Sequence, residues 1–548
     1  MTVIDVIIMA VYVGVLFAAG IYFYRWIETP DDFYVAGRKL TPFILAAALT
    51  ATNVNVYSFI GQSGTAYDQG ISIIWHTWTG NMALVLSGLF VVPIFRRLRI
   101  RTVAEFIGMR YTQSFRGLVG VIWIFRLAWW LSVGTYATAV AAQTFTGITS
   151  FSFWVVVLVI VTVTYTLLGG LWSVTLTDTL QFILMLGGAL VLLPLAMNAV
   201  GGFEGLQQAL PEDHLALITQ EGEFNWIFLI AMMLLSIKWA TVDQGVLQRA
   251  FGAEQVRTSA KGMVLAGIVT TPFAFLWIFP GLAAAVLYQD LGNFDAAVPT
   301  LIIEYFPPGL LGLMGCGLLS AMMSTIDSNL HAVATLFTSD IYGGVLDQDP
   351  SHEASLRVAR WTIILVGVLV ASFALLVKAW GEGAVEANLT VVGILDMPLF
   401  VVGIVYGLLW QRANWQGALW GYFIGVAAGL AVYFLGEGSF NLATLSSTGA
   451  ALVACPIVTL LTSEQDASKT APIWKARDPV ETGDERELYH IVPHSAAGKG
   501  CIAAVLLGFV LYFVGALSGS VGFGRASELA VGGMLMVFGG GLGRLFVD

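Results

Sequence analysis

Hydroxyl groups and a carboxylate interrupt an otherwise apolar stretch near residues 309–338. In the segment GLLSAMMSTIDSNLHAVATLF, four small residues are spaced i, i+3, i+4 and i+7 and so share one helix face: Ala321, Ser324, Thr325 and Ser328. Such a stripe often packs helices together. However, Asp327 beside it would cost about 2.5–3.5 kcal/mol at membrane depth unless a cation offsets its charge. Because hard cations prefer oxygen ligands, the pattern favours a cation site.

A second polar interruption lies in the stretch near 42–62, where the chain reads LTATNVNVYSFIGQSGTAY. Asn53 and Asn55, together with serine and glycine residues, occupy what would otherwise be a plain apolar helix. One interpretation is an unwound helix whose freed carbonyls point at an ion or a substrate. The alternative is a helix–helix contact through small residues. Asparagine is not small, so the unwound helix is favoured.

Other ionisable residues stand in apolar surroundings. Asp178, in SVTLTDTLQF, is either a cation ligand or an interfacial carboxylate in water. Lys238 and Asp243 are five residues apart, a poor spacing for a pair within one helix. We therefore expect Lys238 to pair with another helix, with Asp396 as the candidate, or to meet an anionic substrate group. Arg126, in WIFRLAWW, has the same alternatives, and a structural ion pair is favoured for both.

The elements that must position these residues are membrane spans. The 548 residues are 57% hydrophobic and 11% charged, whereas soluble domains carry about 25% charged residues. So few charges could not cover the surface of a soluble protein of this size. With about 20 apolar residues needed for each crossing, we expect about fifteen helices, near 3–24, 42–62, 72–95, 117–145, 150–169, 175–199, 225–246, 262–288, 309–338, 358–378, 388–410, 415–435, 444–463, 501–519 and 528–547.

Basic residues in alternate loops predict the orientation, because cytoplasmic loops are rich in lysine and arginine. They are Arg25, Arg38 and Lys39; Arg96, Arg97, Arg99, Arg101 and Arg110; Arg249, Arg257 and Lys261; and Arg357 and Arg360. The intervening loops are nearly free of them, and the loop 200–224 is acidic instead. We therefore expect a multi-pass protein of the inner (plasma) membrane with its N-terminus outside, and a solvated cytoplasmic linker at 464–500.

Several separated motifs resemble those of the sodium–solute symporter family, over roughly residues 30–465. They are DDFYVAGRKL followed by SFIGQSGTAYDQG, then LLGGLWSVTLTDTLQ, DQGVLQRAF and LSAMMSTIDSNLHAVATLFTSDIY. The resemblance implies an all-α membrane protein of the LeuT type, built from two inverted five-helix repeats. Its parts would be an extra N-terminal helix (1–30), the first repeat (40–200), the second repeat (225–410), two further helices (411–463), the linker (464–500) and a C-terminal helix pair (501–548).

The resemblance also implies two kinds of binding site, with Na⁺ as the coupling ion. The family's main sodium site falls on the carbonyls of Ala51, Val54 and Ala321 and the hydroxyls of Ser324 and Thr325. A second sodium, used by some members, would lie at Asp178, with Asp327 and Ser328 facing it. By alignment with a bacterial galactose-transporting member, the solute contacts would be Asn53, Ser58, Thr77, Ser236, Trp239 and Thr270.

The identity of the solute stays open at this point. Asn53 matches a sugar contact of that member, whereas Ser58, Thr77, Ser236 and Thr270 stand where it has larger polar or charged side chains. A sugar or polyol and an amino acid or carboxylate are both compatible with the sequence.

Two other classes of protein are less favoured. A membrane sensor built on the same fold would carry a soluble catalytic domain after its last helix. An enzyme would show a motif such as HExxH, GxSxG or GxxxxGK[ST], and none is found. We therefore expect a symporter that is not an enzyme. Its partners would be sodium, a small organic solute and the lipid bilayer, with neither nucleic acid nor an obligate protein partner.

Overall fold

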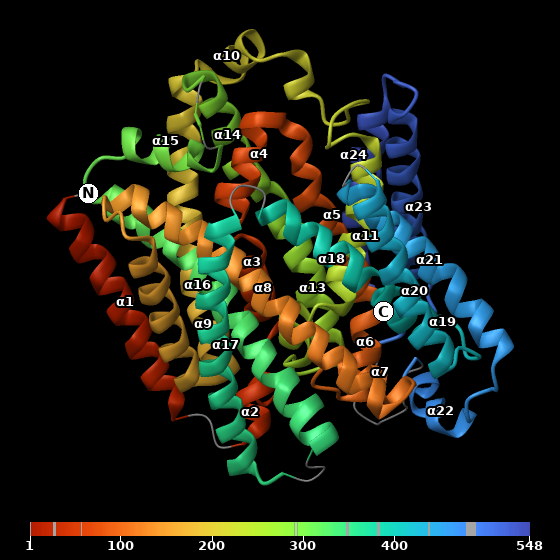
Figure 1. Cartoon of the computed structure of the whole chain (residues 1–548). Helices are drawn as coiled ribbons and strands as arrows, with labels where there is room; N and C mark the ends of the chain where they lie inside the picture. Colours follow the sequence, from red (N-terminus) through yellow and green to blue (C-terminus); the bar gives the residue numbers. More distant parts are fainter. Residues whose placement is uncertain are drawn as a thin grey trace.

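The structure is a computed structural model of the chain, and it is helical throughout the part that it describes (Figure 1). The described residues are 2–25, 29–55, 57–289, 291–292, 294–346, 350–380, 384–436, 439–477 and 489–547. The all-α fold expected from the composition is confirmed.

The helices before residue 210 contain the first of two broken spans. They are α1 (Val3–Tyr24), α2 (Pro30–Val35), α3 (Pro42–Asn53), α4 (Ser63–Gln69), α5 (Ile74–Leu86), α6 (Val92–Leu98), α7 (Val103–Arg110), α8 (Gln113–Thr146), α9 (Phe151–Ala199) and α10 (Gly202–Ala209). Short 3₁₀ or π-helical segments join several of them: η1 (Ala36–Arg38), η2 (Tyr57–Gln62), η3 (Ile71–Ile73), η4 (Ser87–Val91) and η5 (Glu212–Leu215).

The remaining helices contain the second broken span and the C-terminal pair. They are α11 (Trp226–Val242), α12 (Gln244–Phe251), α13 (Val256–Thr270), α14 (Phe275–Leu287), α15 (Ala297–Tyr305), α16 (Leu310–Leu336), α17 (His352–Trp380), α18 (Ala384–Phe400), α19 (Tyr406–Leu409), α20 (Trp415–Leu435), α21 (Phe440–Leu461), α22 (Ala467–Lys475), α23 (Ala496–Gly519) and α24 (Ala526–Phe546). The short segments among them are η6 (Thr271–Ala274), η7 (Phe294–Ala296), η8 (Phe337–Leu346) and η9 (Val401–Val405).

The fifteen membrane crossings expected are not all confirmed by helix length and hydropathy. Among the described residues, eleven helices are long and apolar enough to span a bilayer, and thirteen if two bent pairs each count as one span. The two other expected spans correspond to shorter apolar stretches, Val3–Ala19 and Phe151–Thr164. The latter belongs to α9, one continuous helix where we expected two spans, 150–169 and 175–199.

Each bent pair has a local cause. The first joins α3 to η2 and α4 with a bend of 49°, and Val54, which follows α3, has φ −88° and ψ 91°. The second joins α11 to α12 with a bend of 42° at Asp243, whose φ is −69° and ψ 120°. The Asp243 carboxylate accepts the N–H of Gly245 at 3.0 Å and so caps α12. The predicted interruption of the 42–62 helix is therefore present.

The broken helices lie inside the molecule, surrounded by other helices (Figure 1). α3 packs against α13 and α9, α5 packs against α11, and α16 packs against α9, α8 and α1. α20 pairs with α21, and α23 with α24, on the side away from α1. The expected two-repeat organisation stays a prediction, in which the two broken helices are the first helices of the repeats.

Two opposite faces of this helical body differ in charge. We call the face that carries α2, α7 and α22, at the bottom of Figure 1, the arginine-rich face, and the one that carries α4, α10 and α15 the α10 face.

Three of the arginines that were counted as loop residues lie in helices and are not solvated. Arg96, Arg110 and Arg249 are almost fully buried. Arg96 donates to the carbonyls of Ala253 and Glu254, in the connection between α12 and α13, both at 2.9 Å.

The segment 464–500 is also less solvated than expected. α22 packs on α7 and α6, and the Arg97 guanidinium donates to the carbonyls of Ala476 and Tyr489. The Tyr489 ring is buried, and its hydroxyl donates to the Leu89 carbonyl at 3.2 Å. The described parts of this linker therefore lie against the helical body.

Candidate functional site

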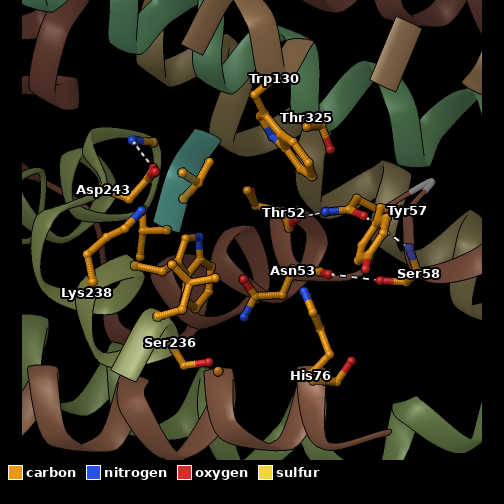
Figure 2. A pocket seen from close by; sticks show the side chains of 18 of the residues that line it. Thr52, Asn53, Tyr57, Ser58, His76, Trp130, Ser236, Lys238, Asp243 and Thr325 are labelled. Atoms are coloured by element: carbon orange, nitrogen blue, oxygen red, sulfur yellow. Dashed lines mark hydrogen bonds between the residues drawn. The ribbon is translucent and has the colours of Figure 1, made fainter. Parts of the chain in front are cut away.

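A cavity of about 160 Å³ lies beside the break of α3, between α5, α8, α11 and α16 (Figure 2). It is smaller than the ~300–1,000 Å³ typical of sites for drug-sized ligands, so it suits a small solute. Its polar and aromatic lining includes Thr52, Asn53, Asn55, Tyr57, Ser58, Gln62, His76, Thr77, Arg126, Trp130, Ser236, Lys238, Trp239, Asp243, Thr325 and Asn329.

Side chains near the break of α3 bond the carbonyls at the end of that helix. The amide of Asn55 donates to the Thr52 carbonyl at 3.2 Å, and the hydroxyl of Ser58 donates to the Asn53 carbonyl at 3.3 Å (Figure 2). The N–H of Ser58 bonds the Asn55 carbonyl, three residues back instead of four. The break is therefore held open by its own asparagine and serine side chains, which act as caps.

The predicted main sodium site lies where this break meets α16. The Ser324 hydroxyl is 3.4 Å from the Ala51 carbonyl oxygen, which brings two predicted oxygen ligands together. Thr325 follows on α16 and lines the cavity, and Val54 is the first residue after α3. Ala321 belongs to α16, but its side chain lies outside the described part of the chain. Carbonyl and hydroxyl oxygens meet here as a hard cation requires.

Five of the six predicted solute contacts line the cavity: Asn53, Ser58, Thr77, Ser236 and Trp239. The sixth, Thr270, does not, and its hydroxyl is bonded to Ala266 and Thr50 instead. Neither amide atom of Asn53 has a hydrogen-bond partner among the described residues, and Figure 2 shows this side chain between Ser236 and Ser58. A buried amide without partners is costly, so the N–H and C=O groups of the Asn53 side chain are available to hydrogen-bond a ligand.

His76 lines the cavity, and a chain of hydrogen bonds determines its tautomer. The indole N–H of Trp277 can only donate, and it donates to Gln62 Oε1 at 3.0 Å. The other amide atom of Gln62 is therefore the nitrogen, which lies 3.1 Å from His76 Nδ1 and donates to it. A neutral His76 consequently carries its proton on Nε2, where it is a donor.

Four charged side chains at the cavity form one buried network. Lys238 Nζ lies 2.7 Å from Asp396 Oδ2, which is the pairing that the sequence analysis suggested. Arg126 lies 3.1 Å from the same oxygen and 2.6 Å from Asp243 Oδ2. All four side chains are less than a tenth exposed. Two cations and two carboxylates leave the network formally neutral, so its members act as a structural cluster in the cavity wall.

Asp178 lies in a second buried cluster, between α9, α12 and α16. Its Oδ2 is 2.6 Å from Arg249 Nη2, which also donates to the Ser328 hydroxyl. The Ser328 hydroxyl is 3.1 Å from Asp327 Oδ1, so the three predicted second-site residues are brought together. Asp178 Oδ1 and the Thr175 hydroxyl have no hydrogen-bond partner among the described residues. Two carboxylates and one guanidinium give a formal charge of −1.

Several cavity residues were missed by sequence reasoning. Gln62, His76 and Trp130 are polar or aromatic side chains that lie within apolar spans, and polar residues at membrane depth were an available signal. Arg249 was missed as a partner of Asp178 because this residue, the one basic residue of DQGVLQRAF, was counted as a loop charge.

A helix broken beside an oxygen-lined cavity, in the middle of a helical membrane body, defines the class of secondary transporters. The model of the sodium:solute symporter family matches residues 33–425, and the chain belongs to this family. It is 27% identical over 464 residues to the sodium/glucose cotransporter of Vibrio parahaemolyticus, covering 78% of this chain and 84% of that protein. It is 27% identical over 469 residues to the sodium/myo-inositol cotransporter 2 of Oryctolagus cuniculus, covering 78% and 69%.

Solved structures support the fold. A sodium-coupled sialic acid symporter in a substrate-bound, outward-open state has a TM-score of 0.76 at 23% identity, over 85% of this chain and 99% of that one. Mhp1, a nucleobase-cation-symport-1 family transporter, has a TM-score of 0.52 at 16% identity, over 81% and 98%. The LeuT-type fold is therefore confirmed. The protein is a multi-pass, sodium-coupled secondary active transporter that imports a small organic solute, with Na⁺ as its coupling ion.

Proposed function

We propose that the imported solute is neutral and polyhydroxylated, a sugar or a cyclic polyol. The observation that carries this proposal is the neutrality of the cavity wall. Arg126 and Lys238 are matched by Asp243 and Asp396, whereas the Asn53 amide lacks partners among the described residues. A cavity whose available groups are neutral donors and acceptors suits hydroxyl groups rather than an ionic group. The named substrates of the relatives, glucose and myo-inositol, agree.

The aromatic lining supports the same solute class. Tyr57, Trp130 and Trp239 line the cavity, and such side chains offer broad apolar faces with a polar edge. A cyclic polyol has apolar C–H faces and a rim of hydroxyls, so it can stack on the rings while its rim bonds Asn53 and His76. Thr77 and Ser236 are bonded to Gln62 and Thr79 respectively and would position their neighbours as well as meet the solute.

We further propose that the main sodium ion binds the carbonyls of Ala51, Val54 and Ala321 and the hydroxyls of Ser324 and Thr325. Ala51 and Val54 flank Asn53 on one break of α3. A cation on their carbonyls would fix the backbone that presents the Asn53 amide to the solute. Sodium would then raise solute affinity, and by linkage the solute would raise sodium affinity by the same factor.

A second sodium is proposed at Asp178, Asp327 and Ser328. The cluster's formal charge of −1, with Arg249 included, is what one monovalent cation would balance. The Asp178 oxygen and Thr175 hydroxyl without partners among the described residues are available ligands.

We propose that the arginine-rich face is cytoplasmic, with the N-terminus outside, in the inner (plasma) membrane. Arg38, Arg97, Arg99 and Arg101 lie at this face, as the positive-inside rule requires. In this role the protein is a transporter and not an enzyme, and it needs neither nucleic acid nor an obligate protein partner.

An amino acid or a carboxylate is the second candidate, because Lys238 and Arg126 line the cavity and could bind an anionic group if their partners moved. Purified protein should be tested for thermal stabilisation by glucose, myo-inositol, an α-amino acid and a monocarboxylate, each in sodium and in potassium. We expect sodium-dependent stabilisation by a neutral polyol. Stabilisation by the charged solutes alone would replace the first candidate with the second.

The proposed main site is tested by a double change, Ser324→Ala with Thr325→Ala. Removal of two ligand oxygens should raise the sodium concentration for half-maximal uptake. The affinity for sodium should fall more than the affinity for the solute. Ser372→Ala, an exposed hydroxyl on α17, is the matched control and should leave that concentration unchanged. An unaltered sodium dependence in the double variant would refute the site.

A further inference from the structure

Three of the hydroxyl groups that line the solute cavity already donate their protons to other groups of the protein. A serine or threonine hydroxyl has one proton to donate and two lone pairs that accept. Where a protein acceptor holds the proton, the side chain can meet a solute only as an acceptor. The direction of each hydrogen bond in the cavity wall therefore decides which groups the solute must offer.

The direction of the bond between Ser236 and Thr79 follows from the other partner of Thr79. The two hydroxyl oxygens are 2.8 Å apart, and Thr79 Oγ1 lies 2.7 Å from the Trp75 carbonyl oxygen. A carbonyl oxygen can only accept, so the single proton of Thr79 lies on that bond. Ser236 must then donate to Thr79, and it faces the cavity with lone pairs alone. Thr79 itself is fully buried behind Ser236.

The same reasoning applies to Thr77 and Ser58. Gln62 Oε1 accepts the indole N–H of Trp277, so this atom is the carbonyl oxygen of the amide. Thr77 therefore donates its own proton to Gln62 Oε1, at 2.9 Å. Ser58 donates to the Asn53 carbonyl oxygen at 3.3 Å. Both hydroxyls thus line the cavity as acceptors.

Other groups of the wall can donate to a solute. The Asn53 amide has no hydrogen-bond partner among the described residues, and a neutral His76 carries its proton on Nε2. Figure 2 shows Asn53 between Ser236 and Ser58. A donor group is therefore set between two hydroxyls that can only accept.

We propose that the cavity selects its solute by the hydrogen bonds that the solute donates, and that Thr79 is the positioning residue that makes Ser236 an acceptor. The proposal rests on the proposed function and narrows its solute class to compounds with several free hydroxyl groups. A group that accepts without donating would place its lone pairs against those of Ser236 or Thr77. Such a group leaves a buried acceptor without a partner, which weakens binding.

The test compares glucose and myo-inositol with analogues in which one hydroxyl at a time is replaced by hydrogen or by fluorine. Fluorine can accept a hydrogen bond weakly but cannot donate one. Each analogue competes with sodium-driven uptake of its radiolabelled parent in proteoliposomes. At positions that donate to the wall, both replacements should weaken binding about 2- to 10-fold, with fluorine no better than hydrogen. At positions that only accept, fluorine should retain more affinity than hydrogen.

Thr79→Val tests the positioning role, because it removes the acceptor of the Ser236 proton and keeps the shape of the side chain. Ser236 can then donate to the solute, so at one position fluorine should become about twofold better than hydrogen. Ser236→Ala identifies that position, since the parent loses affinity there and the analogue lacking that hydroxyl does not.

Two controls accompany the valine variant. Thr79→Ser keeps the hydroxyl and should retain the wild-type analogue profile. Thr162→Val should retain it as well, because Thr162 is a buried threonine of α9 with the same kind of bond to the carbonyl four residues before it. The wild-type and Thr79→Ser profiles decide the donor requirement even if the valine variant does not fold.

Fluorine that retains more affinity than hydrogen at every position of the wild-type profile would overturn the proposal. An analogue profile of folded Thr79→Val identical to that of the wild type would overturn the role of Thr79. Both results leave the proposed function intact. The proposed function fails instead, and the donor requirement with it, if neither glucose nor myo-inositol is taken up with sodium.

Discussion

At the scale of single residues, the amide of Asn53 is the clearest candidate for a solute-binding group, because it faces the cavity without protein partners among the described residues. We predict that Asn53→Ala raises the KM for the solute. Two hydrogen bonds of ~0.5–1.5 kcal/mol each correspond to about a 5- to 150-fold change. Uptake of radiolabelled solute measures it, with Thr270→Ser, outside the cavity lining, as the control. Equal KM values for both variants would remove Asn53 from the site.

The Lys238–Asp396 pair gives a residue-scale prediction about stability. Asp396→Leu leaves Lys238 buried with a positive charge and should cost about 3–5 kcal/mol. Adding Lys238→Met restores a formally neutral network, since Arg126 keeps Asp243 at 2.6 Å. The unfolding temperature of the purified protein should therefore fall in the single variant and recover in the double variant. A double variant no more stable than the single one would contradict the neutral-network interpretation.

Some of these residue roles were predictable and others were not. Lys238 could be assigned to Asp396 because each is an isolated charge in an apolar span, and such charges need a partner. The tautomer of His76 could not be predicted, because it depends on the bond between Gln62 and Trp277. These two residues are 215 positions apart in the chain. Arg249 stands next to loop residues in the sequence, and only the fold shows that it turns inward to Asp178.

At the scale of elements, the C-terminal pair α23–α24 is held together by glycine contacts. A Cβ on Gly533 would clash with the Gly508 carbonyl oxygen, whereas a Cβ on Gly532 would meet nothing within 4 Å. Tyr512 on α23 donates its hydroxyl to the Leu229 carbonyl of α11 at 2.9 Å. The pair thus packs closely and is fastened to one of the broken helices.

We therefore predict that Gly533→Val separates α23 from α24, because overpacking costs about 1–3 kcal/mol. The unfolding temperature and the yield of folded protein should fall. Gly532→Val, one residue away, should behave like the wild type, which makes it a closely matched control. If the two valine variants were equally stable, the close approach of these helices would be wrong.

Helix breaks were easier to predict than helix continuity. The interruption after α3 was visible because Asn53, Asn55 and Ser58 can bond the backbone and compete with helical bonds. The second break is at Asp243, which caps α12. The single helix α9 was not expected, because the apolar stretches 150–169 and 175–199 each have the length of a span.

At the scale of the whole molecule, basic residues in alternate loops predicted an orientation, and a polar interruption in an apolar span predicted where an ion binds. The solute could not be chosen from the sequence, since the same lining residues accept a polyol or a carboxylate until their pairing is known. The neutral network of Arg126, Lys238, Asp243 and Asp396 exists only once α8, α11 and α18 are packed together. Interactions between side chains on distant helices are therefore the part of the site that could not be predicted without the fold.

The number of sodium ions decides how far the transporter can concentrate its solute. One charge moved through 100 mV releases about 2.3 kcal/mol, or about fifty-fold accumulation of a neutral solute, and a second sodium squares that factor. We predict two sodium ions per solute in the wild type and one in Asp178→Asn, because the −1 cluster around Arg249 would lose the charge that attracts the second ion. Reversal potentials of proteoliposomes with set sodium and solute gradients measure the ratio, with Asp68→Asn as the control. A ratio of one in the wild type would mean that Arg249 alone neutralises Asp178, and the second site would be rejected.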